Sequence, residues 1–239
     1  MPCFLSIVIP AYNEEERLKK SLPPLKEFLR QQRFSWELIL VDDGSSDKTW
    51  RIPDSIFADG EVKVIRTPVN RGKGYSVRQG VFASSGEVVL ISDADFSTPI
   101  KEWSKLYDAL QQGYDIAIGS RSLVESNVTV RQAWYREGMG RIFNLFVRLL
   151  VLDGFIDTQC GFKCFRREAV LPVFKKMVID RFSFDVELLF IARKRGLKVK
   201  EVPVEWQNVL FSRVHIVRDS IRMLFDLLKI RVNSRIYDD

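Results

Sequence analysis

Short apolar runs rich in β-branched residues alternate with longer amphipathic segments over the first half of the chain. Five such runs are predicted strands: Leu5–Ile9, Glu37–Val41, Val62–Ile65, Glu87–Ile91 and Asp115–Ile118. Near-continuous apolar strands separated by helices are typical of a parallel sheet that helices cover on both faces. The pattern therefore predicts an α/β fold with a mostly parallel central sheet.

The segments between these runs carry helical signals. The first helix is predicted to begin at Asn13 as N-cap, with Glu16 as its capping-box partner, and Pro23-Pro24 should break or kink it. Its buried positions recur at 4-3-4 spacing: Leu18, Leu22, Leu25 and Leu29. Three further helices are expected to begin at Ser46 or Asp47, to span about Gly74 to Ser84, and to follow Thr98-Pro99.

The pattern weakens after Gly119. The expected pieces are a basic segment (Val124–Arg148), a turn-rich piece (Asp153–Arg167), a helix (Phe184–Arg195), a short strand (Val199–Trp206) and a final helix (about Val214–Val232). Neither a linker nor an internal repeat divides the chain, so residues 1–239 are expected to form a single domain.

Composition narrows the class of protein. The chain has 239 residues, of which 46% are hydrophobic and 28% charged, and this balance excludes disordered and collagenous classes. Cys3, Cys160 and Cys164 are too few for a disulfide framework and are expected to be reduced thiols in a cytosolic compartment. No secretory signal is visible, and the longest apolar stretch, Ile142–Leu152, is interrupted by polar residues and too short to cross a bilayer.

Charge is unevenly distributed along the chain. There are 16 basic and 18 acidic residues up to Val130, but 21 basic and 13 acidic residues from Arg131 onward. This asymmetry suggests that the second half faces something anionic, although a solvated basic face would look the same.

Two carboxylates follow the fourth predicted strand. Ligands of open parallel sheets bind at the carboxyl ends of the strands, which is where Asp93-Ala94-Asp95 lies. Hard oxygen ligands suit Mg²⁺ or Mn²⁺ bridging the phosphates of a nucleotide. A solvated turn is the alternative interpretation, but the position after a buried strand favours a metal site.

Polar residues follow other strands as well. Asp42 and Asp43 could accept hydrogen bonds from a nucleobase and ribose, whereas Asp47 is better explained as a helix cap. In the segment Asn70–Gly74, Lys73 could meet an anion at a helix start, or be solvated on a tight turn. The chain lacks both the G-x-x-x-x-G-K-[ST] and the G-x-G-x-x-G spacings, so P-loop and dinucleotide-oxidoreductase functions lose their main support.

Together these segments resemble the family 2 glycosyltransferases of the GT-A fold. The segments that carry this resemblance are Ile7–Glu14, Val41–Asp47, Asn70–Gly74 and Asp93–Asp95. Three others resemble dolichyl-phosphate glucosyltransferases and bacterial polyprenyl-phosphate relatives: Asp157–Lys163, Phe184–Glu187 and Val202–Trp206. The resemblance covers nearly the whole chain and implies a Rossmann-like sheet with helices on both faces.

The resemblance also implies a chemistry. It implies an inverting transfer from a nucleotide sugar, most simply UDP-glucose, with Asp93 and Asp95 at the metal. The residues expected around the nucleotide are Pro10, Tyr12, Glu14, Asp42 and Asp43. Residues 1–119 would then form the nucleotide-sugar-binding half and residues 120–239 the acceptor-facing half.

This sequence departs from the family pattern at three places. Ser97 stands where phosphomannosyl relatives usually have glutamine, which favours a sugar other than mannose. The family's Gly-Ser-Lys reads Phe211-Ser212-Arg213, so a basic residue is kept and the glycine is lost. The transmembrane anchor with which eukaryotic relatives begin is not found.

A phosphate acceptor needs cations rather than a strong base, because a phosphomonoester is already mostly dianionic at neutral pH. Holding acceptor phosphate and donor diphosphate together is electrostatic catalysis. The candidate cations are Arg121, Arg131, Arg136 and Arg213, the last beside Ser212, although each could be an ordinary surface cation. If a base is needed, Asp185 or Glu187 would supply it, unless these carboxylates pair with Arg193 or Arg195.

Two predicted helices are amphipathic, Met139–Leu152 and the one from Val214. Either could pack on the sheet, but basic polar faces together with a lipid acceptor favour shallow insertion into a membrane surface. The expected partners are thus a nucleotide sugar, a polyprenyl phosphate and the cytoplasmic face of a membrane, with the protein peripherally attached.

Three other functions are left as alternatives. An enzyme of this fold could glycosylate a hydroxyl of a soluble or cell-surface saccharide, and would then need a base such as Asp185. A nucleic-acid-binding protein is disfavoured, because acidic clusters follow the strands and aromatic residues are not interleaved with Lys and Arg. A catalytically silent scaffold is disfavoured by the intact Asp93-Ala94-Asp95.

Overall fold

One seven-stranded sheet organises the protein. The computed structural model describes residues 3–58, 60–130, 134–208 and 216–237. The strand order is β3-β2-β1-β4-β7-β5-β8, and every strand runs in the same direction except β7. The strands are β1 (Leu5–Ala11), β2 (Trp36–Asp42), β3 (Val62–Arg66), β4 (Val88–Ile91), β5 (Ile116–Ser120), β7 (Lys163–Arg166) and β8 (Val199–Pro203). The predicted mostly parallel sheet is confirmed.

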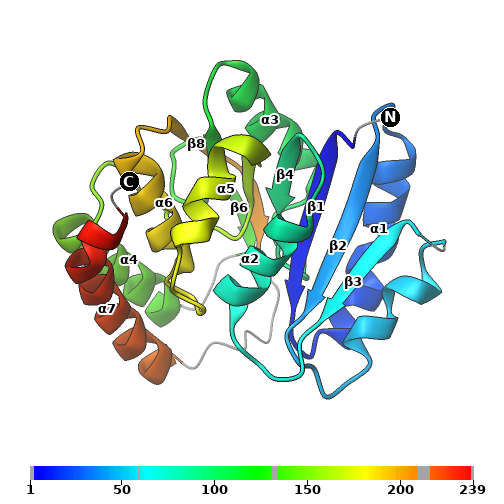
Figure 1. The fold of residues 1–239 in the computed structure, drawn as a ribbon, viewed down its shortest axis with the longest axis horizontal. Helices are drawn as coiled ribbons and strands as arrows, with labels where there is room; N and C mark the ends of the chain where they lie inside the picture. Colours follow the sequence, from blue (N-terminus) through cyan, green and yellow to red (C-terminus); the bar gives the residue numbers. More distant parts are fainter. Residues whose placement is uncertain (1–2, 59, 131–133, 209–215, 238–239) are drawn as a thin grey trace.

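Helices cover both faces of this sheet (Figure 1). They are α1 (Glu15–Arg30), α2 (Lys73–Ala83), α3 (Trp103–Gln111), α4 (Trp134–Leu150), α5 (Arg167–Lys176), α6 (Phe184–Lys194) and α7 (Ile216–Val232). Alternate residues of a strand point to opposite faces. Accordingly, Ile7 of β1 packs in the core under α1 and α3, while Val8 packs in the core shared with α2, α5 and α6.

The start of the first helix differs from the prediction. Asn13 adopts a left-handed conformation (φ 53°) and its Oδ1 accepts the backbone N–H of Ser46, so it does not cap α1. The helix begins at Glu15, whose N–H donates to Asp47 Oδ2, and Asp47 also accepts the N–H of Thr49 at Oδ1. Asp47 is therefore a structural cap, but it serves α1 and its own loop and not, as the sequence had predicted, a following helix.

Two other helix predictions were wrong. Helix α1 runs uninterrupted through Pro23 and Pro24, because its four buried leucines hold both halves against the sheet. No α-helix begins at Ser46 or Asp47; two short 3₁₀ turns, Thr49–Arg51 and Pro53–Ser55, stand there instead. The predicted helix at 74–84 and the buried leucine pattern of α1 are confirmed.

The region after Gly119 contains elements that the pattern did not predict. Strand β7 lies between β4 and β5 and is antiparallel to both, and α5 follows it at once. A second, two-stranded parallel sheet joins β6 (Asn127–Val130) to β9 (Glu205–Gln207). The helix expected after Thr98-Pro99 begins as a 3₁₀ turn, Ile100–Glu102, and continues as α3.

Helices α4 and α7 pack against each other at one side of the molecule (Figure 1). Their inward residues Phe143, Val147 and Leu227 are buried, whereas Leu149 of α4 and Phe225 of α7 are 71% and 67% exposed. No helix of the described residues is both long enough and apolar enough to span a bilayer.

Candidate functional site

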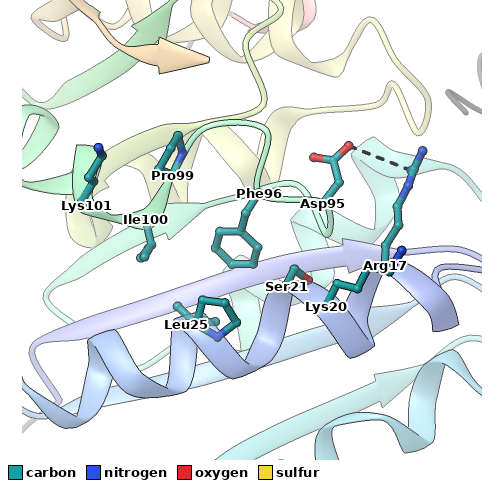
Figure 2. A pocket seen from close by; sticks show the side chains of 10 residues that line it. Arg17, Lys20, Ser21, Leu25, Asp95, Phe96, Pro99, Ile100 and Lys101 are labelled. Atoms are coloured by element: carbon teal, nitrogen blue, oxygen red, sulfur yellow. Dashed lines mark ion pairs between the residues drawn. The ribbon is translucent and has the colours of Figure 1, made fainter. Parts of the chain in front are cut away.

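Asp93 and Asp95 lie directly beyond the carboxyl end of β4 and point in different directions. Asp93 Oδ1 is 2.5 Å from Lys73 Nζ at the start of α2. Asp95 Oδ2 is 4.0 Å from Arg17 Nη1 of α1 (Figure 2). The buried methyl of Ala94 separates them. Both carboxylates are partly exposed, so they remain reachable from solvent.

Asp93 is held from a second side by Gly161. A Cβ added to Gly161 would come within 2.1 Å of Asp93 Oδ2, so only glycine fits against this carboxylate. Burial alone would raise the pKa of Asp93, but the Lys73 ammonium outweighs it and lowers that pKa. The same contact raises the pKa of Lys73, against the effect of burial. The two groups therefore form an ion pair at neutral pH.

The loop that carries Lys73 is fixed by Asp43. Asp43 Oδ1 accepts the N–H of Arg71 (2.9 Å), and its Oδ2 accepts the N–H of Gly72 (2.7 Å). Gly72 has φ +119° and lies against the carbonyl of Asp180, where a Cβ would clash at 2.5 Å. Because both oxygens of Asp43 bind this loop, the carboxylate positions Lys73 within the protein itself.

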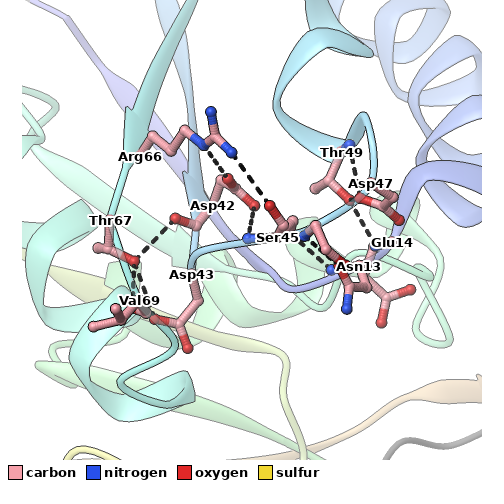
Figure 3. Close-up of polar contacts among 11 residues, drawn as sticks. Asn13, Glu14, Asp42, Asp43, Ser45, Asp47, Thr49, Arg66, Thr67 and Val69 are labelled. Atoms are coloured by element: carbon pink, nitrogen blue, oxygen red, sulfur yellow. Dashed lines mark hydrogen bonds and ion pairs between the residues drawn. The ribbon is translucent and has the colours of Figure 1, made fainter.

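The fully buried Asp42 contacts Ser45 and Arg66 (Figure 3). Its Oδ1 accepts the N–H of Ser45 and its Oδ2 accepts Arg66 Nε, both at 3.2 Å. The guanidinium of Arg66 also lies 5.0 Å from the ring centroid of Trp50. These contacts place a cation and an aromatic face beside the carboxyl end of β2.

The segment after β1 lies beside the same loop. Pro10 and Ala11 end β1 in the core, and Tyr12 is exposed just beyond them. The backbone N–H of Glu14 donates to Thr49 Oγ1, and the Glu14 carboxylate accepts Arg17 Nη1 at 3.0 Å. The structure thus brings together Pro10, Tyr12, Glu14, Asp42, Asp43, Lys73, Asp93 and Asp95 at one edge of the sheet.

Arg121, directly after β5, forms an ion pair with Asp157. The Asp157 carboxylate accepts the backbone N–H, Nε (2.7 Å) and Nη2 (2.9 Å) of Arg121. Burial would raise the pKa of Asp157, but the guanidinium outweighs it and holds that pKa below the usual range. The Arg121 guanidinium also lies 5.6 Å from the ring centroid of Trp206 in β9. Asp157 and Trp206 were not among the predicted site residues, although both lie in segments that carry the resemblance.

Asp185 forms a buried ion pair with Lys163. Lys163 Nζ is 2.5 Å from Asp185 Oδ1 and also donates to the carbonyl of Cys160, and both side chains are almost fully buried. Burial raises the pKa of Asp185 despite this cation. The alternative pairing with Arg193 or Arg195 is therefore wrong for Asp185, because its partner comes from β7; Arg193 pairs with Asp153 instead.

Glu187 is a structural carboxylate. Its oxygens accept the N–H groups of Val178 and Ile179, both at 2.9 Å, and the hydroxyl of Tyr237 at 2.6 Å. It belongs to α6 and is fully buried, so it is unavailable as a base.

The other residues expected to bind the acceptor are not among the side chains that the structure describes. Arg131, Ser212 and Arg213 lie outside the described residues, and so does the side chain of Arg136, whose backbone belongs to α4. Their expected contacts with an acceptor stay predictions.

The loop after Asp95 is attached to strand β9. The Ser97 N–H donates to Asp95 Oδ1 (2.9 Å), and the Ser97 carbonyl accepts the N–H of Gln207 (2.8 Å). Farther along, the N–H of Glu205 donates to the buried carboxylate of Glu102 (3.0 Å), and Lys101 pairs with Glu205. Strand β9 therefore helps to orient Asp95, a role that sequence alone did not reveal.

A cavity of about 470 Å³ opens between α1 and the segment after Asp95 (Figure 2). Leu25, Phe96 and Ile100 give it apolar walls, and Lys20 and Lys101 are also part of its lining. Asp95 lies among these residues, so the cavity adjoins the candidate site.

The acidic pair fits a divalent cation only when other ligands join. Among the described residues, no group of three or more His, Cys, Asp or Glu side chains is arranged to hold a metal ion. Mg²⁺ sites typically use one or two carboxylates together with substrate phosphates, and Asp93 and Asp95 supply that number. A metal ion held by these two carboxylates would therefore need oxygens of a phosphorylated ligand to complete its coordination.

Comparison with known proteins identifies the family. The model of "Glycosyl transferase family 2" matches residues 6–174, which is most of the chain. The chain belongs to glycosyl transferase family 2. It is therefore a glycosyltransferase, as the sequence resemblance implied.

Curated glycosyltransferases of this family resemble the chain over nearly its whole length. The dolichyl-phosphate beta-glucosyltransferase of Dictyostelium discoideum is 35% identical over 95% of this chain and 74% of its own, and that of Homo sapiens is 36% identical over 95% and 75%. The Saccharomyces cerevisiae enzyme of the same name is 34% identical over 96% and 74%.

A solved structure resembles the fold of the glycosyltransferase. Glucosyl-3-phosphoglycerate synthase from Mycobacterium tuberculosis, in complex with Mn²⁺, UDP-glucose and phosphoglyceric acid, superimposes with a TM-score of 0.73 at 18% identity. The match covers 98% of this chain and 80% of that protein. At this identity the similarity establishes the shared fold, and the fold prediction is confirmed.

Proposed function

We propose that this glycosyltransferase moves glucose from UDP-glucose to a polyprenyl phosphate, with inversion at the anomeric carbon. The observation that carries the proposal is the 34–36% identity, over at least 95% of the chain, to three dolichyl-phosphate beta-glucosyltransferases. The cluster of carboxylates and cations at the carboxyl ends of β1, β2 and β4 supports it, because this is where parallel sheets bind ligands.

Donor binding would use the residues gathered at that edge. A Mg²⁺ or Mn²⁺ ion held by Asp93 and Asp95 would neutralise the departing diphosphate. Arg66 and Trp50 would contact a nucleotide bound beside β2. Tyr12 and Glu14 would line the same nucleotide site. Asp42 and Asp43 would act by holding Arg66 and the Lys73 loop in place, since their oxygens already accept hydrogen bonds from these elements.

Acceptor binding would use cations outside the Arg121–Asp157 pair. The bidentate contact with Asp157 occupies one edge of the Arg121 guanidinium, through Nε and Nη2, so this arginine would shape the sugar pocket rather than bind acceptor phosphate alone. Arg131, Arg136 and Arg213, with Ser212, would hold the acceptor phosphate. A dianionic phosphate at neutral pH attacks without a protein base.

The second candidate function is transfer to a saccharide hydroxyl, with Asp185 as base. Asp185 is buried and paired with Lys163 at 2.5 Å, which disfavours a role in removing a proton from substrate. The phosphate acceptor is therefore the better-supported proposal.

We further propose peripheral attachment to the cytoplasmic face of a membrane. The exposed apolar side chains of α4 and α7 lie on two helices that pack together. A basic second half beside these helices would add attraction to anionic lipid. Residues 1–119 would then bind the donor and residues 120–239 would face lipid and acceptor.

One assay tests the proposal. Purified protein is incubated with polyprenyl phosphate, Mg²⁺ or Mn²⁺, and each of a panel of UDP- and GDP-sugars, and the lipid product is identified by mass. UDP-glucose is expected to give the fastest transfer, and Asp95→Asn to abolish it. Glucosylation of a free saccharide without lipid would favour the second candidate instead.

A further inference from the structure

Lys73 forms an ion pair with the oxygen of Asp93 that a metal ion would need as its ligand. Lys73 Nζ lies 2.5 Å from Asp93 Oδ1, and the other oxygen of Asp93 faces Gly161 with no room for even a methyl group between them. A cation that binds Asp93 must therefore compete with the ammonium group of Lys73.

The backbone around Lys73 is fixed, so it cannot move away when a metal ion binds Asp93. Asp43 binds the N–H groups of Arg71 and Gly72, and the N–H of Tyr75 donates to the carbonyl of Asp180. Gly74 is wedged against the Ile179 carbonyl and Phe184, where a Cβ would clash at 2.6 Å. Only the flexible four-carbon stem of the lysine can move.

Three carboxylates around Lys73 already have cationic partners inside the protein. Asp93 pairs with Lys73, Asp157 with Arg121, and Asp185 with Lys163. A divalent cation that entered alone would displace Lys73 from Asp93 and leave two cationic groups next to each other in a partly buried site, which is unfavourable. A diphosphate that entered with the metal would neutralise both the ion and the displaced ammonium.

We infer that Lys73 is an exchangeable internal cation: it holds Asp93 in the empty enzyme and transfers to the donor diphosphate when the metal takes Asp93. This inference rests on the proposed function, because it requires a metal and a diphosphate donor. Its consequence is that metal and nucleotide strengthen each other's binding. By thermodynamic linkage the effect is equal in both directions.

The test measures binding rather than turnover. Mn²⁺ is titrated into the protein with and without saturating UDP, and free Mn²⁺ is followed by electron paramagnetic resonance. Wild-type protein should bind Mn²⁺ weakly alone and about tenfold more tightly with UDP, within the range usual for coupled sites. Lys73→Met should bind Mn²⁺ alone more tightly than wild type, lose most of the gain from UDP, and bind UDP more weakly in the presence of Mn²⁺.

Two variants serve as controls. Lys73→Arg keeps the positive charge and should retain the coupling, and Lys175→Met removes an exposed lysine of α5 and should bind both ligands like wild type. Thermal unfolding verifies that each variant is folded, and Lys73→Gln replaces Lys73→Met if the latter is unstable.

The outcomes separate the inference from the proposed function. If Lys73→Met binds Mn²⁺ alone no more tightly than wild type, or keeps the full gain from UDP, the exchange is overturned while the proposed function stands. If wild-type protein takes up no Mn²⁺ even with UDP, the metal-dependent part of the proposed function fails, and the inference with it.

Discussion

The hydroxyl of Tyr237 donates a 2.6 Å hydrogen bond to the buried carboxylate of Glu187. Tyr237 belongs to the 3₁₀ turn that follows α7, whereas Glu187 lies in the first half of α6. The contact therefore links the segment after α7 to the buried side of α6.

Replacing Tyr237 with phenylalanine should lower the free energy of unfolding by about 1–3 kcal/mol, because a buried acceptor loses a donor. Urea unfolding monitored by circular dichroism measures the change. Tyr107→Phe, at a half-buried tyrosine of α3, is the matched control and should change stability by less. Equal stability of Tyr237→Phe and wild type would show that the contact contributes nothing.

Asp157→Asn should destabilise the protein by about 3 kcal/mol at pH 7, because it leaves the Arg121 guanidinium without its buried partner. The folded-state pKa of Asp157 is lowered, so its stabilising contribution is fully present above about pH 4 and is lost as the pH falls through the folded-state pKa. Urea unfolding at pH 7 and pH 3 should show the variant approaching wild type in acid. A constant difference at both pH values contradicts this assignment.

Glu102→Ala should weaken metal-dependent transfer more than Lys101→Ala does. Glu102 is buried and accepts the N–H of Glu205, so its loss frees β9 from the segment that orients Asp95. Lys101 is largely exposed, and its ion pair with Glu205 is worth at most about 1 kcal/mol. The measurement is the Mn²⁺ concentration that gives half-maximal activity, which should rise for Glu102→Ala and stay near wild type for Lys101→Ala.

Removing one member of the Lys163–Asp185 pair should be costlier than removing both. Asp185→Asn or Lys163→Met alone leaves a buried charge unpaired, at about 3–5 kcal/mol, whereas the double variant leaves none. Thermal and urea unfolding of all four proteins give the coupling energy directly. Additive losses would mean that the two charges do not stabilise each other.

The same double variant separates the two proposed acceptors. With a phosphate acceptor its transfer rate should still rise through about pH 6 and then level off, since the titrating group is the acceptor itself. A folded double variant that binds UDP but is inactive at every pH would support Asp185 as a base.

Introducing negative charge on the exposed faces of α4 and α7 should release the protein from lipid. Leu149→Glu with Phe225→Glu alters two exposed side chains, so the fold should persist while sedimentation with anionic liposomes falls. Wild-type protein should sediment at low salt and be released at high salt, because electrostatic attraction is screened. Ser104→Glu, at an exposed position on α3, is the control and should leave sedimentation unchanged.

The sequence predicted the elements whose signals are local. The five apolar strands and the leucines of α1 each have a pattern contained within a few residues, and all of these are confirmed. The position of Asp93 and Asp95 was also predicted from a local signal, because the end of the apolar run of β4 marks the edge of the sheet. Its ion pairs with Lys73 and Arg17 are contacts between separate elements.

Strand β7 escaped prediction because its stabilisation is not local. It begins with Lys163, a charged residue that would mark a surface turn, and that residue is buried only because Asp185 arrives from α6. Pro23 and Pro24 gave a wrong prediction because their signal is local. Their preference to interrupt a helix was overridden by packing of the flanking leucines. Asn13 was misassigned because its oxygen binds Ser46, which follows another strand.

The placement of β7 also affects how the chain folds as it leaves the ribosome. Strands β1 to β4 are complete by Ile91, yet the open edge of β4 waits for Lys163–Arg166 to be synthesised. At about 5–20 residues per second this interval lasts several seconds, during which an apolar strand edge is available to other chains. Nascent chains stalled before Lys163 should therefore need chaperone protection, and a fragment cut there should aggregate rather than form a smaller nucleotide-binding protein.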